Sequence, residues 1–334
     1  MSSTPQLPLV ASHRGFKSQF AENTMSAFKE ALKAGSRMIE TDVQITLDGV
    51  VVINHDPKTG RNYDSDLIIG DSTLNQLKEL TNVQDPTQKM ATFKELLEWF
   101  VEVDEGEYSN QGLKLMLDVK VSNSKTVLVK IVSDLLAVKN DLQYWQQKII
   151  FGLWTLEFYE FGVTTQCIKD FEIICITISP QIAQAFYDYS QTLPKGLQLT
   201  AISLLNVASM TPEFYTFYDK EIATGKIALY LWTVNEPIDF TRAVYLKAKG
   251  IISDKPDVMV DLLEKYQSGE FTVSEDEKVI QDVTKLAWGF TSAKKLKVLS
   301  SLVAFRIFEV SILYNLVRFS LVQKFLGYLR SLVF

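Results

Sequence analysis

The sequence is poor in two residue types that often carry chemistry, because its 334 residues include only two histidines and two cysteines. Both cysteines, Cys167 and Cys175, lie among apolar residues. So few thiols exclude a disulfide framework and favour a reducing compartment. The first ten residues, MSSTPQLPLV, lack a basic region followed by a long apolar core. We therefore expect no secretory signal.

Acidic residues are scarce in residues 285–334, where eight Lys or Arg accompany a single acid, Glu309. This segment carries a net charge of +7 and residues 1–284 carry −13, within a total of −6. The basic residues alternate with Leu, Val, Ile and Phe, which is not the pattern of a nucleic-acid-binding segment. We expect no nucleic-acid partner, and the tail instead favours an anionic membrane surface.

The composition is that of a globular protein with a large core, with 47% apolar and 22% charged residues. Such a chain is long enough for one α/β barrel and an appendage. Strand and helix patterns alternate about eight times, and the strands are almost continuously apolar, which predicts a (β/α)8 TIM barrel. The expected strands span residues 8–13, 38–44, 113–120, 148–154, 172–179, 197–205, 226–234 and 250–253.

The expected helices fill the intervals between these strands. One begins after Asn23 or Thr24, either of which can cap it, and ends at Gly35. Thr92 and Glu95 form a capping box for the helix that starts at Phe93. The remaining helices span residues 125–140, 155–170, 181–191, 212–224, 236–247 and 256–267.

Three boundaries follow from composition. Residues 57–90, rich in Asp, Asn, Thr and Gly, predict a small irregular insertion just beyond the second strand. The barrel is expected to occupy residues 1–267, an acidic linker residues 268–284, and a basic hydrophobic tail residues 285–334.

The tail contains 20 residues, 298–317, in which Arg306 and Glu309 are the charged positions. A bilayer-spanning helix needs about 20 apolar residues. A helix lying in the membrane plane, or a hairpin, tolerates the two charges better and uses the amphipathic segment 319–334 directly. Packing against the barrel or a dimer contact is a third interpretation. We favour a membrane anchor.

Both histidines of the chain stand at the ends of apolar runs, where His13 closes one strand and His55 follows another. Glu40 and Asp42 lie between them in sequence, two residues apart on one strand, so their side chains leave the same face. The carboxyl ends of barrel strands are where active sites form. Histidine suits proton transfer near neutral pH. Two close carboxylates favour a hard cation, Mg²⁺ or Ca²⁺.

The motifs H-R-G (13–15), E-N-T (22–24), E-T-D (40–42) and H-D (55–56) occur in this order. In this combination the sequence resembles the glycerophosphodiester phosphodiesterase family over roughly residues 8–267. Within that family it is most similar to the fungal phosphatidylglycerol phospholipase C branch. The resemblance implies a metal-dependent TIM barrel that cleaves phosphodiesters attached to glycerol. It also implies His13 as the base and His55 as the acid.

Three further residues are expected to complete the site. Asp118 is the candidate third metal ligand, although the family often has Glu there, and Lys120 shares its face of the strand. The rival interpretation is an Asp118–Lys120 surface pair. Arg14 and Lys120 would then face the phosphate, Arg14 as a fork and Lys120 as a point charge. Trp232 matches an aromatic residue that family members place beside the substrate, with core packing as the rival role.

The motifs leave two roles open. Glu22 and Asn23 belong to E-N-T and are expected either to orient His13 or the metal ligands, or simply to cap the following helix. Asp254, in ISDKP, is explained sufficiently as the cap of the last barrel helix, so it is not placed in the site.

The resulting hypothesis is a phospholipase C that hydrolyses phosphatidylglycerol to diacylglycerol and glycerol phosphate. A phosphodiesterase acting on water-soluble glycerophosphodiesters is the alternative. A catalytically inactive barrel that serves as a membrane scaffold is an alternative of another class, and the intact His and carboxylate motifs disfavour it. The tail over residues 298–334 predicts attachment to a cytosol-facing membrane, and the resemblance implies that this membrane belongs to mitochondria or lipid droplets.

Overall fold

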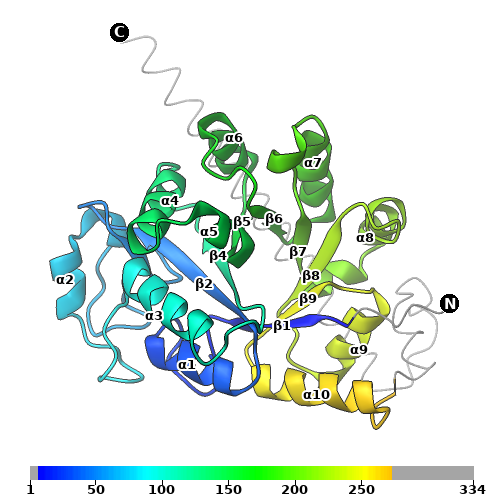
Figure 1. The fold of residues 1–334 in the computed structure, drawn as a ribbon, viewed down its shortest axis with the longest axis horizontal. Helices are drawn as coiled ribbons and strands as arrows, with labels where there is room; N and C mark the ends of the chain where they lie inside the picture. Colours follow the sequence, from blue (N-terminus) through cyan, green and yellow to red (C-terminus); the bar gives the residue numbers. More distant parts are fainter. Residues whose placement is uncertain (1–6, 273–334) are drawn as a thin grey trace.

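A computed structural model describes residues 7–272 and shows a closed barrel of eight parallel strands within this range (Figure 1). Each strand pairs with its neighbour in the order β1-β9-β8-β7-β6-β5-β4-β2, and β1 pairs with β2 to close the ring. The predicted TIM barrel is confirmed. The strands are β1 (Leu9–His13), β2 (Met38–Ile45), β4 (Lys114–Val119), β5 (Ile149–Leu153), β6 (Glu172–Thr177), β7 (Ala201–Leu205), β8 (Ala228–Trp232) and β9 (Gly250–Ser253).

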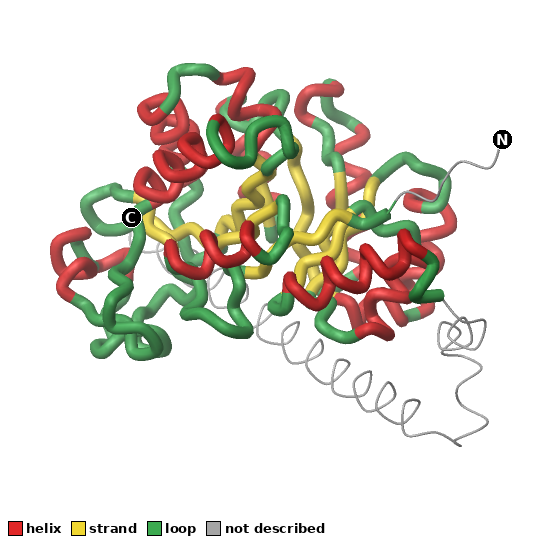
Figure 2. The backbone as a smooth tube through the Cα atoms, turned by 60° about the horizontal axis from the view of Figure 1, so that its bottom comes forward, coloured by secondary structure: helices red, strands yellow, loops and turns green. Residues whose placement is uncertain are grey.

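Helices surround this ring of strands (Figures 1 and 2). The helices that follow the barrel strands are α1 (Met25–Lys33), α3 (Phe93–Glu105), α4 (Val127–Val138), α6 (Leu156–Thr165), α7 (Pro180–Gln191), α8 (Pro212–Phe217), α9 (Pro237–Tyr245) and α10 (Pro256–Ser268). Thr24 caps α1, and the capping box of Thr92 with Glu95 begins α3, as the sequence predicts.

Some short helices were not predicted. Helix α5 (Leu142–Lys148) precedes β5, and Asp141 caps it by accepting a hydrogen bond from the backbone N–H of Tyr144. The expected helix over 212–224 is α8 followed by a π-helical turn, η4 (Tyr218–Ile222). Two 3-10 turns, η2 (Lys195–Leu197) and η3 (Asn206–Met210), flank β7.

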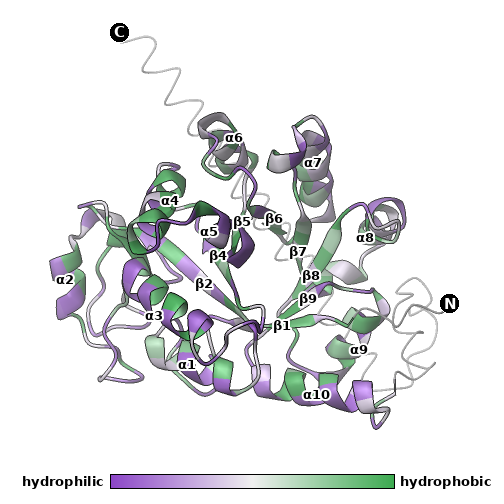
Figure 3. Cartoon of the chain, in the orientation of Figure 1, coloured by the Kyte–Doolittle hydropathy of each residue, from purple (hydrophilic) through white to green (hydrophobic). Residues whose placement is uncertain are grey.

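The barrel has two apolar layers because strand side chains alternate between its inside and its outside. The inner layer includes Ala11, Met38, Met116 and Ile174 from four strands. The outer and larger layer packs the strands against the helices, and in Figure 3 the strand ribbons are mostly hydrophobic. Since Met38 points inward on β2, so do Glu40 and Asp42 two and four residues later.

The insertion after the second barrel strand is more regular than expected. Strand β3 (Val51–Ile53) folds back antiparallel on β2, outside the ring of parallel strands. Residues beyond it include η1 (Ile69–Asp71) and α2 (Leu74–Glu79), and a capping box of Thr73 with Gln76 begins α2. The insertion has a small apolar core of its own, made of Val52, Tyr63, Ile69, Leu77, Leu80 and Met90.

The predicted acidic linker lies mostly, and the basic tail wholly, outside the described residues. The membrane-anchor interpretation of residues 298–317 and 319–334 therefore stays a prediction. Among residues 7–272, no helix combines the length and the apolar character needed to cross a bilayer. Both cysteines are free, so the expectation of no disulfide framework is confirmed.

Gly152 of β5 provides a test of how tightly the barrel is packed. A Cβ at this position would lie 2.5 Å from Cδ1 of Ile176 and 2.9 Å from the backbone oxygen of Leu117. Gly152→Ala should therefore lower the free energy of unfolding by about 1–3 kcal/mol, measured by urea denaturation. Gly70→Ala is the control, because a Cβ there meets no atom within 4 Å. Equal stabilities of the two variants would show that the barrel yields easily at β5.

Candidate active site

Strand register brings the predicted site residues together at the carboxyl ends of three neighbouring strands. His13 at the end of β1 is paired in register with Glu40 of β2. Asp42, further along β2, is paired in register with Asp118 of β4. Adjacent parallel strands place residues in register at the same height and on the same side of the sheet. Three carboxylates and an imidazole from distant parts of the sequence thus meet at one end of the barrel.

The three carboxylates form a compact buried group. Glu40, Asp42 and Asp118 each offer an oxygen, and these oxygens lie within 4.8 Å of one another. Their side chains are 5%, 1% and 8% exposed. Burial without partners would make three negative charges very costly. The ammonium of Lys120 lies between two of them, 2.8 Å from Oδ1 of Asp42 and 2.5 Å from Oδ2 of Asp118.

The carboxylates differ in their charge states because their cationic neighbours are unequally distributed. Burial and the neighbouring Asp42 and Asp118 raise the pKa of Glu40 well above its usual value. Burial alone would also raise the pKa of Asp42, but the charges of Lys120 and Arg14 hold it below its usual range. Without a further cation the site therefore favours the protonated, neutral form of Glu40.

A divalent cation fits this group. Oδ1 of Asp42 is buried and accepts no hydrogen bond, although the Lys120 ammonium contacts it as an ion pair. Three carboxylates from two adjacent strands supply only oxygen ligands, which suits a hard cation. Glu40, Asp42 and Asp118 are thus able to hold the ion, as the sequence predicts, and the added charge would relieve the repulsion at Glu40.

Each histidine is oriented by a carboxylate on its Nδ1. Nδ1 of His13 lies 2.6 Å from Oδ1 of Asp254, and Nδ1 of His55 lies 2.6 Å from Oδ1 of Asp56. In both rings Nε2 is then the nitrogen left for proton transfer. Burial lowers the pKa of His13 despite the hydrogen bond to Asp254, and burial also lowers the pKa of His55, against the opposing charge of Asp42. Both imidazoles are therefore neutral near pH 7.

The two predicted phosphate-binding cations line the same pocket. Arg14 and Lys120 line this pocket together with His13 and His55. The guanidinium of Arg14 donates to Glu22 over 3.1 Å, and its Nε lies 3.3 Å from Oδ2 of Asp42. Its backbone N–H donates to Glu40 over 2.9 Å. The rival interpretation of Asp118 and Lys120 as a surface pair is wrong, because Asp118 is buried and Lys120 is only 13% exposed.

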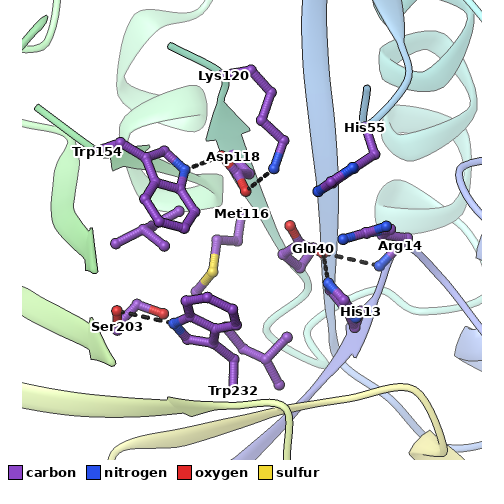
Figure 4. A pocket seen from close by; sticks show the side chains of 12 residues that line it. His13, Arg14, Glu40, His55, Met116, Asp118, Lys120, Trp154, Ser203 and Trp232 are labelled. Atoms are coloured by element: carbon purple, nitrogen blue, oxygen red, sulfur yellow. Dashed lines mark hydrogen bonds and ion pairs between the residues drawn. The ribbon is translucent and has the colours of Figure 1, made fainter. Parts of the chain in front are cut away.

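The pocket is lined by charged side chains and by two indole rings (Figure 4). Arg14 and the histidines lie on one side, the indoles of Trp154 and Trp232 lie on the other, and Glu40 stands between them. The two indole rings meet edge to face with their centroids 5.8 Å apart. Trp232 lines the pocket and also packs against the inner apolar layer of the barrel, so both expected positions apply. The cavity measures about 150 Å³.

Glu22 and Asn23 tie the first loop of the barrel to this site. The amide of Asn23 donates to Oδ2 of Asp42 over 2.7 Å and accepts from Thr41 over 2.8 Å. Asn23 has a positive φ of 57°, and it is Thr24, not Asn23, that caps the helix. Glu22 accepts from Arg14 and from Arg61 of the insertion. Of the two roles considered for this motif, the structure places Asn23 against a metal-ligand candidate.

Asp254 is the residue that sequence reasoning missed. The N-cap of α10 is Lys255, which makes no side-chain capping bond, so the capping interpretation of Asp254 is wrong. Its carboxylate instead holds His13 and accepts from the amide of Asn235 over 2.8 Å. Barrel closure was the available signal, because β9 must pair with β1. Ser253 of β9 is paired in register with Ser12 of β1, so the residues that follow them, Asp254 and His13, lie side by side.

Comparisons with known proteins agree with this geometry. Residues 13–258 match the glycerophosphoryl diester phosphodiesterase family, which is well over half of the chain. The chain belongs to the glycerophosphoryl diester phosphodiesterase family. It is therefore a phosphodiesterase of that family, and the predicted family membership is confirmed.

Individual relatives have low sequence identity to this chain, but the alignments cover most of each relative's length. Lysophospholipase D GDPD1 of Homo sapiens is 26% identical over 293 residues, covering 77% of this chain and 86% of the relative. A glycerophosphodiester phosphodiesterase of Caldanaerobacter subterraneus subsp. tengcongensis is 23% identical over 266 residues, covering 77% of this chain and 98% of the relative.

Solved structures of family members share the fold. The structure of an Oleispira antarctica phosphodiesterase in complex with the product sn-glycerol-3-phosphate superposes with a TM-score of 0.62 at 20% identity. It covers 77% of this chain and 97% of that chain. A glycerophosphodiester phosphodiesterase of Thermotoga maritima gives a TM-score of 0.57 at 21% identity, covering 76% and 98%. At these identities the likeness establishes the barrel.

The Glu22 network predicts a pH-dependent contribution to stability. Burial raises the pKa of Glu22, but Arg61 and Arg14 lower it from 4.5 to about 2. A lowered folded-state pKa stabilises the protein above pH 4.5, and this stabilisation is lost as the pH falls towards 2. Glu22→Gln should cost up to about 3 kcal/mol at pH 7 and clearly less at pH 3, measured by urea denaturation.

Glu30→Gln is the matched control, since Glu30 pairs with Lys33 on an exposed helix face. Its effect should stay within about 0.5 kcal/mol at both pH values. A Glu22→Gln cost that is the same at pH 7 and pH 3 would contradict the assigned ion pairs.

Proposed function

We propose that this family member is a metal-dependent phospholipase C that hydrolyses phosphatidylglycerol to diacylglycerol and glycerol phosphate. The observation that carries the phosphodiesterase chemistry is one pocket lined by His13, His55, Arg14 and Lys120 beside the three buried carboxylates. Phosphodiester cleavage needs a group that takes a proton from the attacking oxygen and another that gives one to the leaving oxygen. Two imidazoles oriented by carboxylates supply both.

The proton-transfer roles follow the difference between the two histidines. His13 is the more enclosed, with a side chain 12% exposed, and Asp254 holds its Nδ1. A neutral imidazole with a carboxylate behind it accepts a proton at Nε2 and is stabilised as the cation. We assign His13 as the base. His55, 31% exposed at the rim, is assigned as the acid that protonates the departing oxygen.

Charge neutralisation is divided between the chain and the cation. The fork of Arg14 and the ammonium of Lys120 bind the phosphate oxygens and orient the phosphorus between the histidines. A Mg²⁺ or Ca²⁺ ion held by Glu40, Asp42 and Asp118 would neutralise the charge that develops on the phosphate. Asn23 keeps Asp42 in place for this role by donating to its second oxygen.

The cavity suits a small head group. At about 150 Å³ it is smaller than the roughly 300–1,000 Å³ of pockets that hold drug-sized ligands. A glycerophosphate unit enters, and the remainder of the substrate stays at the mouth. In phosphatidylglycerol that remainder is diacylglycerol, which belongs in a bilayer. The positive charge of residues 285–334 supports an anionic lipid surface as the partner.

Water-soluble glycerophosphodiesters are the second candidate substrates, and the same small cavity supports them. The Caldanaerobacter relative is called a glycerophosphodiester phosphodiesterase, whereas the human relative is called a lysophospholipase D, so relatives' names include both kinds of substrate. An inactive scaffold has less support, since every predicted catalytic and metal-binding side chain lies at one pocket or its floor.

The cellular setting belongs to the same proposal. We infer attachment to a cytosol-facing membrane through residues 298–334, at mitochondria or lipid droplets. This rests on the apolar run, the basic residues of the tail and the resemblance of the sequence to the fungal branch.

Removal of either imidazole should nearly abolish turnover. His13→Ala and His55→Ala should each lower kcat by ~10²–10⁴-fold, because each takes away one proton-transfer group. The measurement is phosphate-ester release from a glycerophosphodiester in the presence of Mg²⁺ or Ca²⁺. Unchanged thermal unfolding serves as the control for folding. A near-normal rate in the His55 variant would remove that residue from the mechanism.

The substrate assignment predicts a specific order of rates. In mixed micelles the full chain should hydrolyse phosphatidylglycerol faster than phosphatidylcholine or phosphatidylserine, and faster than it hydrolyses glycerophosphocholine. The lipid product should be diacylglycerol. A truncation after Glu275 should lose membrane binding and hydrolysis of bilayer lipid while keeping its rate on water-soluble esters. Faster hydrolysis of glycerophosphocholine than of phosphatidylglycerol would contradict the lipase assignment and leave the phosphodiesterase standing.

A further inference from the structure

The carboxylate of Asp118 has its two oxygens assigned to different partners. Oδ1 accepts a hydrogen bond from the indole N–H of Trp154 over 2.7 Å. Oδ2 accepts from the ammonium of Lys120 over 2.5 Å. Figure 4 shows the indole and the ammonium approaching Asp118 from opposite sides. A neutral indole N–H thus donates to Oδ1, and a charged ammonium contacts Oδ2.

The chain makes this contact possible through a glycine. Gly152 of β5 is in register with Asp118 of β4, so no side chain at that height separates the carboxylate from the next strand. Trp154, two residues beyond Gly152, leaves the same face and reaches back across the gap. A larger residue at 152 would collide with Ile176 before it filled this space.

The indole is itself fixed on its other sides. Trp232 packs edge to face against it, at 76° between the ring planes. Trp232 is anchored in turn by its own N–H, which donates to the backbone oxygen of Ser203 over 3.1 Å. The Lys120 ammonium lies 5.7 Å from the centre of the Trp154 ring. Trp154 therefore has little freedom to turn away from Asp118.

We propose that Trp154 is a positioning residue that makes Asp118 a one-oxygen ligand of the divalent cation. By holding Oδ1, the indole fixes the rotation of the carboxylate and presents Oδ2 towards Glu40 and Asp42. Groups that orient metal ligands by hydrogen bonds are worth roughly 10–100-fold in metal affinity. The inference rests on the proposed cation site and adds to it a residue that never touches the metal.

The test compares two tryptophans of the same pocket wall. Trp154→Phe keeps an aromatic ring and removes the N–H that holds Asp118. Trp232→Phe makes the same change next to it but removes an N–H that donates to a backbone oxygen. Ca²⁺ and Mg²⁺ are each titrated into the full metal-free chain by isothermal titration calorimetry. We expect Trp154→Phe to weaken binding about 10–100-fold, and Trp232→Phe to change the Kd less than about threefold.

Glu40→Gln separates the inference from the function on which it rests. If the wild-type protein binds the ion and both Glu40→Gln and Trp154→Phe weaken binding, the result supports the cation site and the role of Trp154. If the wild-type protein binds the ion and Glu40→Gln weakens binding but Trp154→Phe does not, the result overturns the role of Trp154 alone. Absence of binding by wild type, or unchanged binding by Glu40→Gln, overturns the cation site and with it the inference.

Thermal unfolding of the metal-free variants tests whether Trp154 has only a structural role. If Trp154 only packs the pocket wall, both Phe variants should lose stability to a similar extent and keep the wild-type Kd. That outcome also overturns the proposal. A loss of affinity confined to Trp154→Phe, at equal metal-free stability, supports it.

Discussion

The repulsion among three buried carboxylates is the constraint on which the rest of the site depends. Glu40, Asp42 and Asp118 each offer one carboxylate oxygen at the mouth of an apolar barrel, and these three oxygens lie within 4.8 Å of one another. Such a group persists only where cations compensate it. Lys120 and Arg14 do so in part, because both form ion pairs with Asp42. In the proposed function, the negative charge that would attract a metal also holds the two cations that would bind the phosphate.

Around this centre, the two imidazoles and Asp42 are each held by a second side chain. Asp254 and Asp56 hold the two imidazoles, and Asn23 holds Asp42. Arg61 of the insertion joins Asp56 to Glu22, so the insertion after β3 is part of the support of the site. Side chains fixed in this way keep their geometry without rearranging during the reaction, which is what electrostatic catalysis requires.

The pocket separates two kinds of recognition. Its charged side matches a phosphodiester, and the indoles of Trp154 and Trp232 form an uncharged wall opposite. In the proposed function, a cavity of about 150 Å³ would admit the glycerophosphate unit and leave the remainder of the substrate outside. Whether that remainder is a lipid depends on what brings the mouth to a membrane, and the basic, apolar residues beyond the barrel are the part of the chain suited to that task.

The sequence by itself determined the barrel and the chemical residues. Apolar strands alternating with helices predict the fold. His13 and His55 stand at or just after strand ends, and Glu40 and Asp42 lie within the second barrel strand, where their motifs can be read. Only the tertiary structure decided the partners of these residues. Asp254 lies 241 positions from His13 in sequence, and ring closure alone brings them together. Trp154 reaches Asp118 because the β4–β5 register places a glycine between them. Local patterns specify which face a side chain occupies, whereas strand register and barrel closure specify its neighbours, and those contacts do not repeat with any period along the chain.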